Sequence, residues 1–173
     1  MSHGETALVV LGVDPGATTG WVAYDADQKL VLDSGEFRDA ELSAEFTGWL
    51  DRADRCVLER PRGQGPTRPQ VVECGIVFGM LYEKIQRDVV ETSWLYRLTV
   101  CQRLTFALHG TITVRNDATA WAALVALHGA NSDSKGRTKK GVEVEPPGAI
   151  GRAKGHGRAA LAVAVASLLP DKS

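Results

Sequence analysis

The sequence has few cysteines, no long hydrophobic run and a net charge of only −1, and each of these absences excludes a class of protein. Its three cysteines show no CxxC spacing, which excludes a disulfide scaffold and a zinc ribbon and fits a reducing compartment. Apolar runs such as Ala159–Ala166 are far shorter than the roughly 20 residues of a membrane-spanning helix. The first residues lack the basic stretch of a signal peptide. We therefore expect a cytoplasmic protein without a membrane partner.

The small net charge conceals a strong asymmetry along the chain. Residues 1–50 hold nine acids and two bases (net −7), whereas residues 51–173 hold twelve acids and eighteen bases (net +6). The basic part is able to contact phosphates even though the total charge is slightly negative. The length of 173 residues suits one domain, because two domains would each be small for a core of ordinary size. We expect a single domain over residues 1–173.

The hydrophobic pattern predicts a mixed α/β domain in the order β-β-β-α-β-α-β-α-α-α. Residues 7–13 are apolar without alternation, which is typical of a central strand buried on both faces. The other predicted elements are strands at 21–25, 29–37, 55–59 and 88–92, a helix at 39–50 capped by Asp39, and helices at 70–87, 98–108, 117–128 and 158–169. Residues 130–155 are rich in Gly, Ser, Lys and Pro and predict a flexible basic loop.

Two acids follow predicted central strands, at the positions where α/β sheets present their ligands. Asp14 precedes Pro15-Gly16, which fits a phosphate-facing site and an ordinary turn about equally well. Glu59 ends the strand 55–59, directly before a loop rich in Pro, Gly and Arg. Such a pair can face each other at one sheet edge, and Mg²⁺ is usually held by one or two carboxylates with waters and phosphate oxygens. Glu91 and Asp117 are further acids that the sequence does not place.

Three segments, VDPGATTGW, VLERP and GHGRAALAVAVA, occur in an order that resembles the RuvC-type Holliday-junction resolvases of the RNase H-like superfamily. Each motif is short, and their ordered combination over nearly the whole chain carries the resemblance. It implies an α/β fold with an RNase H-like mixed five-stranded sheet flanked by helices. It also implies a homodimer, with the 70–87 helix at the seam, that resolves four-way junction DNA by symmetric phosphodiester hydrolysis. The cofactor implied is Mg²⁺ or Mn²⁺, with two ions per subunit.

The resemblance also assigns site residues. Asp14 and Glu59 match the first two metal ligands of the family. His156 matches the third position, as a metal ligand or a group that assists proton transfer. Ala159 stands where the family has an aspartate, and it can serve neither purpose. Either the chain is a natural variant with a reduced site, or a substitution has disabled a catalytic acid.

Ala159 therefore leaves two functions open. One is a Mg²⁺-dependent structure-selective endonuclease, and the other is a junction-binding protein with a degenerate, inactive metal site. A third function, an actin-like or sugar-kinase ATPase, is suggested by the Asp-x-Gly-x-Thr-x-Gly pattern at Asp14. Such ATPases need two lobes and a second phosphate motif, and this chain has room for one lobe.

Basic residues flank the proposed ligands in two stretches, where they would surround the site with charge for phosphate contacts. A solvated loop without a ligand is the ordinary alternative for such a charge run. The residues expected to bind DNA are Arg60, Arg62, Arg68, Lys135, Arg137, Lys139, Lys140, Arg152, Lys154 and Arg158.

Overall fold

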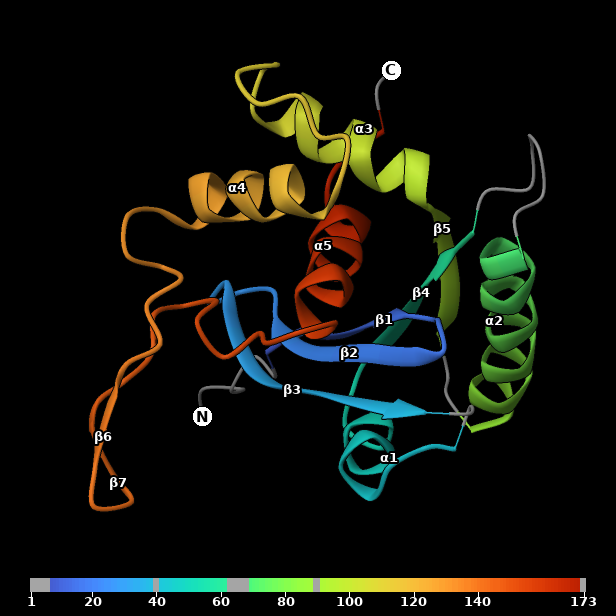
Figure 1. The fold of residues 1–173 in the computed structure, drawn as a ribbon, viewed down its shortest axis with the longest axis horizontal. Helices are drawn as coiled ribbons and strands as arrows, with labels where there is room; N and C mark the ends of the chain where they lie inside the picture. Colours follow the sequence, from blue (N-terminus) through green and yellow to red (C-terminus); the bar gives the residue numbers. More distant parts are fainter. Residues whose placement is uncertain (1–6, 39–40, 62–68, 89–90, 172–173) are drawn as a thin grey trace, which may run out of the picture.

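A computed structural model describes residues 7–38, 41–61, 69–88 and 91–171 of the chain. Its main sheet has five strands in the order β3-β2-β1-β4-β5 (Figure 1). The strands are β1 (Val9–Asp14), β2 (Thr18–Asp25), β3 (Leu30–Arg38), β4 (Arg55–Arg60) and β5 (Thr92–Tyr96). The first three form an antiparallel meander, whereas β4 runs parallel to β1 and β5 runs parallel to β4. The predicted mixed five-stranded sheet is confirmed.

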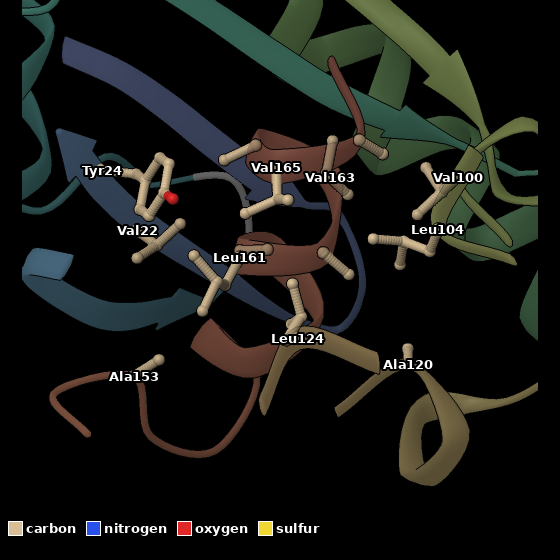
Figure 2. Close-up of a cluster of buried hydrophobic side chains, with 14 of the residues drawn as sticks. Val22, Tyr24, Val100, Leu104, Ala120, Leu124, Ala153, Leu161, Val163 and Val165 are labelled. Atoms are coloured by element: carbon tan, nitrogen blue, oxygen red, sulfur yellow. The ribbon is translucent and has the colours of Figure 1, made fainter. Parts of the chain in front are cut away.

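Helices cover both faces of the sheet because β1 is apolar on both sides. Val10 packs in one buried cluster with α5 (Gly157–Leu168), α3 (Arg97–Ala107) and α4 (Asp117–His128). Figure 2 shows Leu161 of α5 in this cluster, near Leu124 of α4. Leu11 and Val13 face the opposite side, which is covered by α1 (Ala44–Leu50) and α2 (Pro69–Asp88). The two apolar layers hold the carboxyl end of β1 at a fixed place between them.

The helix α5 lies unusually close to the sheet. A Cβ atom added at Gly12 would overlap the carbonyl oxygen of Ala160, and one added at Gly20 would overlap the backbone of His156. Glycine in β1 and β2 and small residues in α5 therefore let main-chain atoms meet directly. This contact fixes the start of α5 beside the end of β1.

Two predicted boundaries are wrong. The strand expected at 88–92 lies at Thr92–Tyr96 instead, since α2 continues to Asp88 and β4 pairs from Cys56↔Thr92 to Arg60↔Tyr96. The first helix begins at Ala44, where the Oγ of Ser43 accepts a hydrogen bond from the backbone N–H of Phe46 at 3.2 Å. The cap expected at Asp39 lies outside the described residues.

The segment predicted as a loop at 130–155 contains a β-hairpin that extends from the body of the molecule (Figure 1). Its strands are β6 (Arg137–Lys139) and β7 (Val142–Glu145). Lys140 and Gly141 form the turn with φ of 52° and 77°, as a two-residue type I′ turn requires. The missed signal was the Lys140-Gly141 pair, which is followed by the alternating residues Val-Glu-Val-Glu.

Candidate active site

Asp14 and Glu59 lie side by side at the carboxyl edge of the parallel strands. The register pairs Val13 with Leu58, so the next residue on each strand is one of the two acids. Because strand side chains alternate between faces, Asp14 lies on the same face as Gly12, which contacts α5. The sheet thus brings together the two acids that the sequence singled out.

Burial raises the pKa of both carboxyl groups. Desolvation raises the pKa of Asp14 to about 6, with Arg97 acting to lower it and Asp117 to raise it. Glu59 is only 9% exposed, and its burial together with the charge of Asp14 raises its pKa to about 7 against the lowering effect of Arg97. Closely spaced acids with raised pKa values are common at catalytic and cation-binding sites.

Arg97 joins two acids of this region. It directly follows β5, beside the end of β4, and its Nη1 donates a hydrogen bond to Oε2 of Glu59 at 3.3 Å. Its Nη2 donates to Oδ1 of Asp117, the first residue of α4. Sequence reasoning missed Arg97, because an arginine after a strand has no distinctive pattern and β5 itself was misplaced.

The start of α5 forms another wall of the site. A cavity of about 500 Å³ is lined by nine residues, namely Asp14, Asp117, Ala118, Ala120, Trp121, Gly155, His156, Arg158 and Ala159. Asp117 therefore belongs to the site, although the sequence did not place it there. Its position is set by the capping box of Asn116 and Thr119 at the start of α4. Ala159 presents only a methyl group to the cavity.

The side chains of the expected ligands do not form a complete metal-binding group. In the described part of the chain, no three His, Cys, Asp or Glu residues are grouped so that they could hold a metal ion. Glu59 is bonded to Arg97, and the backbone N–H of His156 donates to Oε1 of Glu36 at 2.8 Å. The metal-binding and catalytic roles of Asp14, Glu59 and His156 stay predictions.

The donors that are present nevertheless fit one divalent ion. Mg²⁺ is bound by one or two protein carboxylates and completes its shell with waters and phosphate oxygens. Asp14 and Glu59 provide such a pair, and their raised pKa values are those of neighbouring buried acids that a bound cation would neutralise. The expectation of two ions per subunit stays a prediction.

The predicted DNA-binding residues lie in different settings. The guanidinium of Arg60 lies 4.5 Å from the ring centre of Trp94, and that of Arg158 lies 4.5 Å from the ring centre of Trp121. Arg137 and Arg152 form ion pairs with Glu145 and Glu143. Lys135, Lys139, Lys140 and Lys154 are exposed, while Arg62 and Arg68 lie outside the described residues. DNA binding by these residues stays a prediction.

The sheet order β3-β2-β1-β4-β5, with helices on both faces, is that of an RNase H-like fold. No family model matches the sequence, and no curated protein matches it. Solved structures that are similar in fold include two of RuvC. One is T. thermophilus RuvC in complex with a Holliday junction substrate, with a TM-score of 0.51, 16% identity and coverage of 92% of this chain and 91% of that chain.

The other is a Thermus thermophilus RuvC structure, with a TM-score of 0.54, 15% identity and coverage of 91% of this chain and 92% of that chain. The match to RuvC over most of both chains confirms the predicted fold. Within the described ranges, no helix is long and apolar enough to cross a membrane.

Proposed function

We propose that this protein binds four-way DNA junctions and hydrolyses phosphodiester bonds in them with the help of a divalent ion. The observation that carries the proposal is the adjacency of Asp14 and Glu59 at the carboxyl edge of an RNase H-like sheet, beside the start of α5. The likeness to a RuvC in complex with a junction supports the choice of DNA substrate.

Asp14 and Glu59 would hold one Mg²⁺ or Mn²⁺. When bound, such an ion polarises a phosphoryl oxygen and lowers the pKa of a coordinated water. His156 lines the same cavity as Asp14, where its imidazole would serve as a metal ligand or assist proton transfer.

Basic side chains around this edge would hold the DNA backbone. Arg158 lines the cavity itself, and its guanidinium is held over Trp121. Arg60 directly follows Glu59 and is stacked among Trp94, Tyr96 and Phe78. Lys139 and Lys140 on the hairpin are exposed and would add further contacts to phosphates. Backbone contacts of this kind suit recognition of DNA shape rather than sequence.

A homodimer would match the two-fold symmetry of a four-way junction. Val72, Ile76 and Met80 recur every four residues along α2 and are 47%, 59% and 47% exposed. Residues at this spacing lie on one helix face, so they form an apolar stripe suited to pairing with a second copy.

Cleavage of a synthetic four-way junction in Mg²⁺ tests the proposal. We expect slow cleavage by the unaltered chain and faster cleavage by Ala159→Asp, because an aspartate would add an oxygen donor beside Asp14. Adding Asp14→Asn to that variant should abolish cleavage while junction binding, measured by gel shift, is retained. Full cleavage by the double variant would contradict the role of Asp14.

Junction binding without cleavage is the second candidate function. Ala159 and the ion pair between Arg97 and Glu59 favour it, since both reduce the capacity of the site for metal. Salt-sensitive binding of junctions, with no cleavage by either the unaltered chain or Ala159→Asp, is the result expected of a pure binding protein.

A further inference from the structure

Arg97 makes two contacts at the site, and they lie in different environments. Its bond to Glu59 is shielded, because the Glu59 side chain is 11% exposed and that of Arg97 is 30% exposed. Its bond to Asp117 lies at the surface, since the Asp117 side chain is 75% exposed. An arginine fork that joins two carboxylates is more strongly oriented than a single ion pair.

The contact with Glu59 uses an oxygen that a metal ion would need. Arg97 Nη1 donates to Oε2 of Glu59, and the neighbouring donor Asp14 lies on the adjacent strand. Displacing the guanidinium from Glu59 would not release it into solvent, because Asp117 still holds its Nη2. The arginine would remain at the edge of the cavity that Asp117 lines.

We propose that Arg97 is the cation that occupies this carboxylate site in the metal-free protein. A divalent ion displaces its guanidinium from Glu59, while Asp117 keeps the guanidinium at the rim of the cavity. The inference rests on the proposed function for its divalent ion. Arg97 is then a positioning residue, and its charge opposes metal binding until Glu59 exchanges partners. The Nη1 donor that Glu59 gives up becomes available to a phosphate oxygen of bound DNA.

Titration of the DNA-free protein with Mn²⁺, with free Mn²⁺ followed by electron paramagnetic resonance, tests this inference without any activity assay. In Arg97→Gln the ion has no cation to displace, and we expect the Kd for Mn²⁺ to fall about tenfold, which corresponds to about 1.4 kcal/mol. An unchanged Kd would overturn the inference and leave the proposed function standing.

Arg158→Gln is the matched control. Arg158 lines the same cavity, but its guanidinium is held over Trp121. Removing its charge should change the Kd by less than about twofold, since Arg158 is exposed and its charge is not among those that shift the pKa of Asp14 or Glu59. A gain equal to that of Arg97→Gln would show that net charge alone acts, and would overturn the inference.

Arg97→Lys keeps the test decisive if Arg97→Gln does not fold. Lysine retains the charge, but its ammonium group lacks the planar fork that bridges Glu59 and Asp117. We expect its Kd for Mn²⁺ to fall about threefold, and an unchanged value would count against the fork. Absence of Mn²⁺ binding by all variants at millimolar concentrations would overturn both this inference and the metal-dependent function.

Discussion

Replacing Asp14 by asparagine should stabilise the metal-free protein at alkaline pH. The pKa of Asp14 is raised from 3.8 to about 6, chiefly by burial, so the folded state holds its proton more tightly than the unfolded state. The free energy of unfolding therefore falls as pH rises between about 4 and 6, and the stabilising contribution of the proton is lost above the folded pKa. Asparagine carries no charge, so in Asp14→Asn this decrease in the free energy of unfolding with rising pH is absent.

The magnitude follows from the size of the shift. A difference of about two pKa units corresponds to roughly 3 kcal/mol at pH 8, which is an upper limit because an asparagine amide at this site also needs hydrogen-bond partners. We expect a gain of about 1–3 kcal/mol for Asp14→Asn at pH 8 and almost none at pH 4. For a chain of this length the gain corresponds to a rise in Tm of roughly 2–10 °C.

Urea unfolding in the presence of EDTA, monitored by tryptophan fluorescence at pH 4, 6 and 8, measures this effect. Asp133→Asn is the matched control, because its carboxylate is exposed. A loss of stability in Asp14→Asn at pH 8, or a gain that does not depend on pH, would refute the reasoning. Adding Mg²⁺ should reverse the order of stability, since the ion binds only the folded protein with both carboxylates.

Three further predictions concern the rest of the molecule. Neutralising Lys135, Lys139 and Lys140 together should lower the slope of log affinity against log salt for junction DNA by about 2–3 units, as measured by fluorescence anisotropy. An unchanged slope would mean that these lysines do not contact phosphates. Ile76→Glu should convert the proposed dimer into a monomer, as measured by light scattering, whereas Gln70→Glu on the same helix should not. A monomeric unaltered chain would exclude the α2 interface. Gly12→Ala should lower the free energy of unfolding, measured with urea, by about 1–3 kcal/mol because its Cβ would overlap α5. At Gly79 an added Cβ meets no atom within 4 Å, so Gly79→Ala should stabilise α2 by up to about 1 kcal/mol.

The sheet and the acid pair were predictable because their signals are local and repetitive. A strand such as residues 7–13 is apolar on both faces, and an acid that ends it must lie at a sheet edge. Glu59 was placed in the same way, by the strand before it. Their place at the ends of two central strands predicted that the two acids can face each other, and the parallel pairing of β1 with β4 brings them to the same edge.

The second half of the site was not predictable, because it depends on packing between distant segments. Arg97 reaches Glu59 only because β5 pairs with β4 in one particular register, and the sequence pattern placed that strand four residues too early. Asp117 reaches the site through the packing of α4 against α5. The residue pattern within one segment of the chain cannot predict the contacts that this segment makes with a distant one.

The direct contact of α5 with Gly12 and Gly20 separates the architecture of the site from its chemistry. The helix is located by main-chain atoms of residues 156 and 160, so the side chain at position 159 has little part in holding it. A single codon change there can add or remove a carboxylate while the scaffold stays intact. Under the proposed function, this arrangement would let one substitution at position 159 remove or restore cleavage while the surfaces that bind DNA stay unchanged.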